Sequence, residues 1–407
     1  MKYVIIGAGI AGVEAAKTIR IQDPAGEIVM VSTDTHVHSR CMLHKYISGE
    51  RDEQGLDFTE KDFFEKYRIE WKKGITVKSI HPENKEIILM NEEHVSYDKL
   101  LIAAGADSFI PPVGDLRKAS NVYGLRNLSD AQAIVKEAEL AEHVLVIGSG
   151  LVGLDAAYGL LERGKKLTVV EMADRILPVQ LDAHAAKAYQ EAFEKAGVRF
   201  VLERKASQAV CEPDGKIHKV ILDNGDEIPC DLIIVAAGVR PALSCLEGSG
   251  IACDRGITVD AALKTSMDDI YAAGDITGLS GIWPNAADQG RIAGKNMCSV
   301  LAEYTDTYAM KNTINFFGLI TLCVGRIREE EGDEIHIQED HTQYKRVILK
   351  DGKVQGILLQ GNIAGAGFWQ YLIKNHIDTT LVRQDIFNIS YGDFYQTGEK
   401  GKYEWKL

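Results

Sequence analysis

Short apolar runs and segments with helical spacing alternate at the start of the chain. Residues 2–6 form a largely apolar run, residues 13–19 have a helical pattern, and residues 28–31 form the next apolar run. Apolar runs of this length are typical of strands buried in a parallel sheet. The order therefore predicts a strand–helix–strand unit in the first 31 residues.

The same order of elements returns later in the chain. Residues 143–147 and 167–170 are apolar runs, and residues 154–161 between them have a helical pattern. A strand–helix–strand unit of this kind is the building block of doubly wound α/β folds. We therefore predict an α/β protein with two such units.

A glycine-rich turn joins the first strand to the first helix in each unit. The first turn reads Gly7-Ala8-Gly9-Ile10-Ala11-Gly12. In this context Gly7 permits the turn, Gly9 lets backbone amides approach a pyrophosphate, and Gly12 lets helix and strand pack closely, while the helix N-terminus faces the anion. We expect Gly7, Gly9, Ala11 and Gly12 to bind a dinucleotide.

The second turn repeats this fingerprint as Gly148-Ser149-Gly150-Leu151-Val152-Gly153. Two complete fingerprints predict two dinucleotide sites, the alternative being that one is a structural turn without a ligand. In the second site we expect contacts from Gly148, Gly150, Leu151 and Val152.

Glu171 follows the second strand of the second unit, where an acid hydrogen-bonds the ribose hydroxyls of NAD. A 2′-phosphate there would meet a carboxylate, at a cost on the order of 1–4 kcal/mol for two unit charges about 4 Å apart. This predicts NAD(H) rather than NADP(H), unless Glu171 is only a solvated strand end. In the first site the ribose candidate is Asp34, for which a loop-surface aspartate is the alternative.

Further segments complete a resemblance to a known family. They are residues 101–106, 234–241, 270–275 and 283–291. With the two fingerprints, they resemble the pyridine-nucleotide and FAD-dependent oxidoreductases of the glutathione-reductase fold, and especially the NADH reductases of the rubredoxin, ferredoxin and nitrite-reductase type. The resemblance implies that FAD and NAD(H) are the cofactors. It adds as cofactor-binding residues Ala104, Gly105, Gly238, Gly274, Asp275, Trp283 and Gln289.

The resemblance also implies a domain layout. Residues 1–113 and 243–305 would form an FAD-binding domain, interrupted by an NAD-binding domain of residues 114–242. Residues 306–407 would form a C-terminal α+β interface domain. Asp275, an acid after an apolar strand and a glycine, suits a ribityl hydroxyl of FAD. Val77 resembles the family position that touches the adenine.

The loop of residues 36–46 carries the candidate chemistry. Arg40 resembles a residue near the FAD pyrophosphate, and Lys45 resembles a lysine beside flavin N5. The family pairs that lysine with a glutamate, and the matching residue here is Asp155, one methylene shorter. An ammonium held by a carboxylate would stabilise the negative charge that the flavin gains on reduction.

Cys41 in the same loop leaves two interpretations open. It aligns with the redox cysteine of single-cysteine reductases of coenzyme A disulfide or persulfide, and a thiolate near basic residues would be reactive. Alternatively, it is a small buried residue in place of a proline. His36, His38, Cys41 and His44 have metal-ligating side chains, but no second half-site lies nearby, and we predict no metal.

The C-terminal region has apolar stretches at 313–324, 344–349 and 354–360, and residues 369–373 fit a short helix. The resemblance implies a mixed sheet at a dimer or partner interface. The tail, residues 388–395, is rich in aromatic residues. We expect it to pack on its own domain, the alternative being contact with a partner or a second subunit.

Composition narrows the setting. The chain has 407 residues, which suggests two or three domains, and its net charge of -13 argues against nucleic acid as a partner. The seven cysteines form no Cys-x-x-Cys, and no apolar run reaches the roughly 18 residues of a membrane span. The N-terminus leads straight into a strand without a signal-peptide pattern, so we expect a cytoplasmic protein.

Three functional classes follow. The first is an NADH-dependent flavin reductase that serves an iron–sulfur carrier such as rubredoxin, ferredoxin or a carbon-monoxide-dehydrogenase-linked protein. The second is a reductase of disulfides, persulfides or peroxides that uses Cys41. The third is a flavin-bearing redox sensor without turnover. The first is favoured, because the Arg40 to Lys45 segment resembles reductases that need no protein cysteine.

Overall fold

The computed structural model describes residues 1–306, 311–382, 384–398 and 401–405. The chain divides into two compact units. The first contains residues 1–172 and 197–306, and the second contains residues 173–196 together with the described residues from 311 onward. Each unit is described by itself below.

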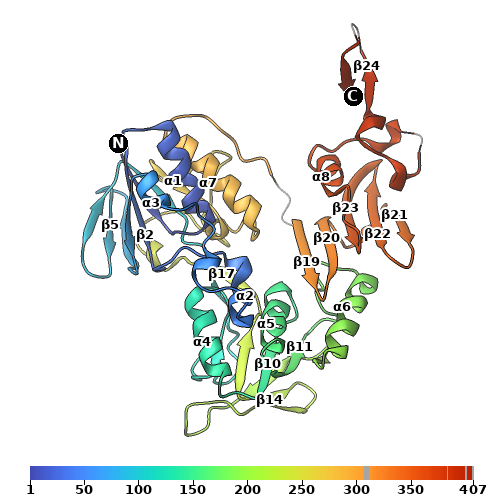
Figure 1. Cartoon of the computed structure of the whole chain (residues 1–407). Helices are drawn as coiled ribbons and strands as arrows, with labels where there is room; N and C mark the ends of the chain where they lie inside the picture. The colour runs from blue at the N-terminus through green and yellow to red at the C-terminus, as the bar shows by residue number, and fades with distance from the viewer. Residues whose placement is uncertain (307–310, 383, 399–400, 406–407) are drawn as a thin grey trace. The chain divides into compact units, whose positions relative to one another are not determined.

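A five-stranded parallel sheet organises the first part of the first unit (Figure 1). Its strand order is β18 (Ile270–Ala272), β7 (Lys99–Ile102), β1 (Lys2–Ile6), β2 (Glu27–Ser32) and β3 (Ile69–Lys73). In the register of the sheet, Ile5 lies opposite Met30 on one side and Leu101 on the other. The strands are apolar because the sheet is buried on both faces.

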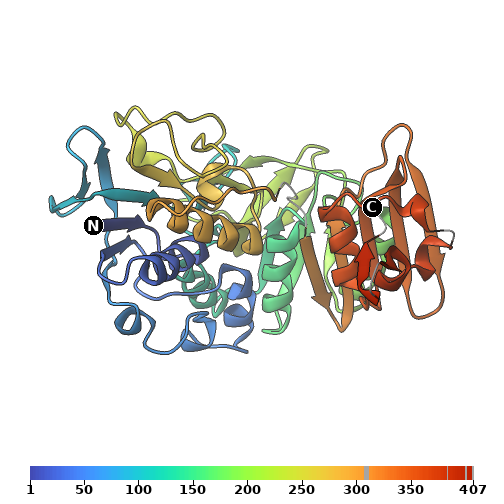
Figure 2. The ribbon, with the colours of Figure 1, turned by 90° about the horizontal axis from the view of Figure 1, so that it is seen from above.

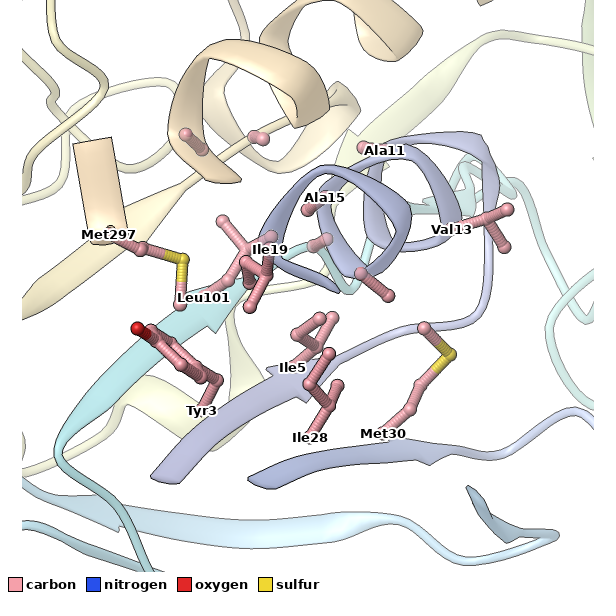
Figure 3. Packing of buried hydrophobic residues seen from close by; sticks show 14 of the residues in the cluster. Tyr3, Ile5, Ala11, Val13, Ala15, Ile19, Ile28, Met30, Leu101 and Met297 are labelled. Carbon is pink, nitrogen blue, oxygen red and sulfur yellow. The ribbon is translucent and has the colours of Figure 1, made fainter. Parts of the chain in front are cut away.

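Two helices, α1 (Ile10–Gln22) and α7 (Trp283–Met297), lie side by side in both views of the ribbon (Figures 1 and 2). Their backbones approach closely, since a Cβ on Gly290 would fall 2.2 Å from the Ala11 carbonyl oxygen. Below α1, buried side chains of the sheet such as Tyr3, Ile5 and Met30 pack against Ile19 and its neighbours (Figure 3). This core fixes the N-terminus of α1 at the end of β1.

A second parallel sheet lies in the same unit, with the order β12 (Arg199–Val201), β11 (Lys166–Val170), β10 (His143–Ile147), β16 (Leu232–Val235) and β9 (Val122–Tyr123). Its helices are α4 (Leu128–Ala138) and α5 (Leu151–Leu161). The unit also contains the short helices α2 (Leu43–Ser48) and α3 (Phe63–Lys66).

Smaller antiparallel sheets complete the first unit. They are β4 (Val77–His81), β5 (Glu86–Leu89) and β6 (His94–Ser96), then β13 (Ala206–Ala209), β14 (Lys219–Leu222) and β15 (Glu227–Pro229), and the pair β8 (Ala106–Ser108) and β17 (Val239–Pro241).

The second unit is built on a five-stranded antiparallel sheet. Its order is β19 (Lys311–Phe316), β20 (Leu319–Gly325), β23 (Lys353–Gln360), β22 (Tyr344–Lys350) and β21 (Glu334–Glu339). Helix α8 (Ala366–Lys374) packs on this sheet, and a short hairpin, β24 (Tyr395–Thr397) and β25 (Tyr403–Trp405), follows it. Helix α6 (Ala183–Lys195) belongs to this unit, and the Tyr189 hydroxyl lies 2.8 Å from the Leu319 carbonyl oxygen.

The predicted fold class is confirmed, and the predicted strands and helices of both nucleotide-binding units are present. The apolar stretch at 313–324 is two strands, because Phe317 and Gly318 turn the chain. Strand β21 was not predicted, since its partly exposed sequence has no apolar run. Phe394 is fully buried in the core of the second unit, so the aromatic tail packs on its own domain, as expected.

Candidate functional site

The first glycine-rich turn combines close packing with open space. Gly7 has φ 110°, and a Cβ there would fall 2.2 Å from the Ala103 carbonyl oxygen. A Cβ on Gly12 would fall 2.0 Å from the Gly7 carbonyl oxygen. A Cβ on Gly9, the N-cap of α1, would meet no atom within 4 Å. Gly7 and Gly12 are thus needed for packing, while Gly9 leaves room beside free backbone amides.

A pocket opens at this turn, at the carboxyl ends of the parallel strands. Twelve of the predicted site residues line it: Gly7, Gly9, Ala11, Asp34, Arg40, Cys41, Val77, Ala104, Gly105, Gly274, Asp275 and Trp283. They come from segments that lie far apart in the sequence, and the parallel sheet brings them to one edge. This is the place where doubly wound folds bind their ligands.

Two half-buried arginines each form an ion pair with an acid of the pocket. An Arg40 Nη2 group donates to the Asp34 carboxylate at 3.1 Å, and its Nη1 donates to the Arg126 carbonyl oxygen at 3.0 Å. Arg126 in turn forms an ion pair with Asp275 and donates from Nε to the Ala106 carbonyl oxygen at 3.1 Å. Asp34 and Asp275 therefore each face an arginine inside the pocket.

Arg126 was missed by the sequence analysis. It directly precedes α4, whose first turn forms a capping box from Asn127 and Asp130, and its own backbone N–H donates to Asp130 at 2.9 Å. The capping box is visible in the sequence as Asn-x-x-Asp before a helix. It predicts the helix, but only the packing of α4 at the pocket places the arginine beside Asp275.

His38 connects the loop of residues 36–46 to the start of α4. Its Nε2 accepts from the Leu128 backbone N–H at 3.2 Å, and its Nδ1 donates to the His36 carbonyl oxygen at 3.1 Å. Burial and the charge of Arg40 lower the pKa of His38, which fits the neutral ring that these two bonds require. Within the described residues no cluster of His, Cys, Asp or Glu is arranged to hold a metal ion.

Gln289 supports the pocket from behind. It is fully buried and accepts from the Gly274 backbone N–H at 2.7 Å. It therefore fixes the turn that presents Asp275, without lining the pocket itself. Trp283, at the N-terminus of α7, does line it and packs edge-on against Phe58, with ring centroids 4.7 Å apart.

These features fit FAD. The space beside Gly9, which a Cβ would fill, lies at a helix N-terminus and suits the pyrophosphate. Asp275 and Asp34 present carboxylates that can accept from ribityl and ribose hydroxyls, and Val77 adds an apolar surface for an adenine. The same residues account for both the polar and the apolar parts of the nucleotide.

The second glycine-rich turn has the same geometry. Gly148 has φ 102°, and a Cβ on Gly153 would fall 2.0 Å from the Gly148 carbonyl oxygen. A Cβ on Gly150 would meet nothing within 4 Å. The Glu171 carboxylate accepts from the Ser149 backbone N–H at 2.8 Å and from its hydroxyl at 2.9 Å. Glu171 is thus fixed beside the turn, where it can meet a ribose.

Three further predicted residues surround this second turn. Leu151 and Val152 begin α5, and Val152 is 42% exposed. Gly238, with φ 100°, has open space where a Cβ would stand. These positions leave the N-terminus of α5 accessible to a dinucleotide.

The predicted contact between Lys45 and Asp155 differs from the one in the structure. Lys45 Nζ lies 2.5 Å from the Glu50 carboxylate, and it is His44 whose Nδ1 lies 3.6 Å from Asp155 Oδ1. Burial raises the pKa of Asp155 to about 7, against the opposing charge of Lys45. Lys45 therefore acts on Asp155 through space without forming the direct pair.

The surroundings of Cys41 oppose a thiolate. The Cys41 side chain is exposed at the pocket, so the alternative prediction of a small buried residue is wrong. Desolvation by the surrounding protein raises the pKa of this thiol, and the negative charge of Asp155 raises it further, while Arg126 and Arg40 act in the opposite direction. Together these effects raise the pKa of Cys41 above its ordinary value. Cys41 thus lines the pocket, but its surroundings favour the thiol over the thiolate.

Two parallel sheets, with a pocket lined by the predicted FAD-binding residues at the first and an NAD-type acid at the second, define a flavin- and pyridine-nucleotide-dependent oxidoreductase. Residues 1–290 match the family described as pyridine nucleotide-disulphide oxidoreductase. The chain belongs to this family. The predicted family and its two cofactors, FAD and NAD(H), are confirmed.

Known relatives cover nearly the whole chain. It is 31% identical to the NADH-dependent phenylglyoxylate dehydrogenase subunit epsilon of Aromatoleum evansii, over 94% of this chain and 93% of the relative. It is 30% identical to the 3-phenylpropionate/cinnamic acid dioxygenase ferredoxin–NAD(+) reductase component of Photorhabdus laumondii, over 85% and 89%. The chain spans about half the length of two other relatives that it matches.

Among solved structures, a NAD-dependent persulfide reductase from A. fulgidus superposes with a TM-score of 0.85 and 25% identity, over 95% of this chain and 79% of that one. The fold is thus shared by enzymes whose names point to different acceptors. Within the described residues, no helix is long and apolar enough to cross a membrane.

Proposed function

We propose that this protein is an NADH-dependent flavoprotein reductase that passes electrons between NADH and a small iron–sulfur protein. The observation that carries the choice of acceptor is the environment of Cys41: the neighbouring Lys45 pairs with Glu50 and, within the described residues, leaves the thiol without a cation of its own, and desolvation and Asp155 raise the pKa of the thiol. A disulfide or persulfide reductase needs a reactive thiolate at this place. The ferredoxin–NAD(+) reductase component among the relatives supports the same acceptor class.

The chain's own residues position the two nucleotides. Glu171, held by Ser149, binds the ribose of NADH, and the amides beside Gly150 bind its pyrophosphate. Asp275, held by Arg126, binds the ribityl chain of FAD. When bound, FAD accepts a hydride from NADH and returns electrons one at a time, which a single-electron acceptor requires. No step of this scheme needs a cysteine.

We also propose a three-domain organisation for the chain. Residues 1–113 and 243–305 form the FAD-binding domain, residues 114–242 the NAD-binding domain, and residues 306–407 an interface domain for a partner or a second copy in a homodimer. All seven cysteines are free thiols, which suits a reducing cytoplasm.

Anaerobic titration of the FAD-loaded protein with NADH tests the function. We expect full bleaching with about one NADH per FAD, and no long-wavelength charge-transfer band, because the flavin is the only two-electron store. Cys41→Ser should then retain NADH-dependent reduction of a ferredoxin or rubredoxin. Consumption of about two NADH per FAD, with the second lost in Cys41→Ser, would instead establish the thiol reductase. A protein without turnover on any acceptor would be a sensor.

A further inference from the structure

Helix α2 packs against α5 at Gly159. A Cβ on Gly159 would fall 2.8 Å from the His44 carbonyl oxygen and 3.2 Å from Ile47 Cβ. The missing side chain therefore lets the backbone of α2 approach α5 closely. Asp155 precedes Gly159 by four residues and so lies on the same face of α5, one turn nearer its N-terminus. The packing of the two helices fixes which residue of α2 meets Asp155.

That residue is His44. Its Nδ1 lies 3.6 Å from Asp155 Oδ1, and only 15% of the His44 side chain and 27% of the Asp155 side chain are exposed. The buried His44 Nδ1 has no hydrogen-bond partner in the part of the chain that the structure describes. An unsatisfied buried nitrogen costs about 1–3 kcal/mol. A shift of a few tenths of an ångström would bring the two groups into a hydrogen bond.

Other charged groups surround the pair without replacing it. Lys45 and Arg51 oppose a positive charge on His44, and Glu50 and the Cys41 backbone favour it. Lys45 is also the charge that acts on Asp155. Helix α4 also packs on α2, and the charge of its Asp130 acts on His38 and Arg40.

The two groups favour one shared proton. Burial raises the pKa of Asp155 to about 7. Burial and, to a smaller extent, the charge of Lys45 lower the pKa of His44 to about 4. At neutral pH the ring is therefore uncharged, and the carboxyl is close to its titration point. An Oδ1–H···Nδ1 bond satisfies both groups and buries no net charge.

We propose that Asp155 and His44 hold one proton between Oδ1 and Nδ1 at the edge of the flavin pocket, and that this proton is bound when the pocket gains negative charge and released when that charge leaves. The inference rests on the proposed function in so far as the pocket holds FAD. The pair is within electrostatic reach of the pocket, because the charge of Asp155 acts on Cys41, which lines it. His44 is a positioning residue that acts through Asp155.

Protons and electrons balance over one cycle of reduction and reoxidation. A hydride from NADH brings two electrons and one proton into the pocket, and a second proton from solvent binds between Asp155 and His44. Two one-electron acceptors then remove the two electrons, and both protons return to solvent. The net reaction converts NADH and two oxidised acceptors into NAD⁺, two reduced acceptors and one proton.

Nuclear magnetic resonance of the FAD-loaded protein, labelled with ¹⁵N in histidine, tests the pair without turnover. In the wild type, the His44 ring nitrogens should shift near neutral pH, as Asp155 titrates. Asp155→Asn should abolish this shift, because an amide does not titrate there. His36→Gln, which changes another histidine of the same loop, should leave it unchanged. A His44 shift near neutral pH that persists in Asp155→Asn overturns the proposal.

Proton uptake on anaerobic reduction provides the second measurement, with a pH indicator dye in weakly buffered solution. Asp155→Asn and His44→Gln should each take up fewer protons per flavin than the wild type at neutral pH, by up to about one. Asp155→Glu should retain the uptake, with its midpoint displaced. Equal uptake in the wild type and both disruptive variants overturns the proposal. A wild type that fails only to reduce iron–sulfur proteins refutes the proposed acceptor and leaves both measurements interpretable.

Discussion

Gly150→Ala should separate NADH binding from folding and from FAD binding. Gly150 has φ -69° and ψ -178°, which an alanine adopts without strain, and its new Cβ would meet no protein atom within 4 Å. We therefore expect the variant to fold and to retain FAD. The Cβ would stand in the space beside the N-terminus of α5, where the NADH pyrophosphate is expected.

The size of the effect follows from the amides at that N-terminus. A methyl group would displace the pyrophosphate by roughly 1 Å and weaken two charge-assisted hydrogen bonds, each of which contributes about 1.5–3 kcal/mol. A loss of about 3 kcal/mol corresponds to roughly 100-fold weaker NADH binding.

The assay compares the KM for NADH, the FAD content and the melting temperature across matched variants. Gly9→Ala, the equivalent change in the first turn, should instead lower the FAD content. Gly153→Ala should destabilise the protein, since its Cβ would fall 2.0 Å from the Gly148 carbonyl oxygen. If Gly150→Ala bound NADH within twofold of the wild type, the second turn would not be the pyridine-nucleotide site.

Three further predictions concern charged groups. Glu171→Gln should narrow the preference for NADH over NADPH by roughly tenfold in kcat/KM, because a carboxylate no longer repels a 2′-phosphate; an unchanged ratio would contradict this role. Asp275→Ala should accelerate loss of FAD on dilution, since it removes a polyol ligand and the ion-pair partner of Arg126; full FAD retention in gel filtration would argue against it. In His44→Gln, Asp155 should keep its raised pKa of about 7 in the folded state, so that the folded state binds this proton more tightly than the unfolded state does. The free energy of unfolding should therefore fall by up to about 3 kcal/mol as pH rises from about 4 to 7. In Asp155→Asn it should fall as pH drops from 6.5 toward 4, because the pKa of His44 is lowered to about 4 in the folded state; denaturant titrations across this range check both signs.

Much of the candidate site was predictable because it is local. Gly7, Gly9 and Gly12 lie within one strand–turn–helix segment, and the close approach of Gly12 to the Gly7 carbonyl oxygen is set inside that segment, whereas the approach of Gly7 to Ala103 depends on the neighbouring strand β7. Asp275 and Trp283 required the family resemblance, because no local rule brings them to the first turn. The parallel sheet does so by placing β18 next to β7, at the same edge as β1.

The sequence by itself determined the two nucleotide-binding units, their glycine turns and the acid Glu171, since short-range periodicity and backbone sterics specify them. The tertiary structure alone decided which charges meet. Arg126 reaches Asp275 from a distance of 149 residues, and His44 takes the place beside Asp155 that the family resemblance implied for Lys45. Neighbouring residues on a short helix point in directions about 100° apart. Only the close packing of α2 on Gly159 selects which of them faces the half-buried Asp155 carboxyl.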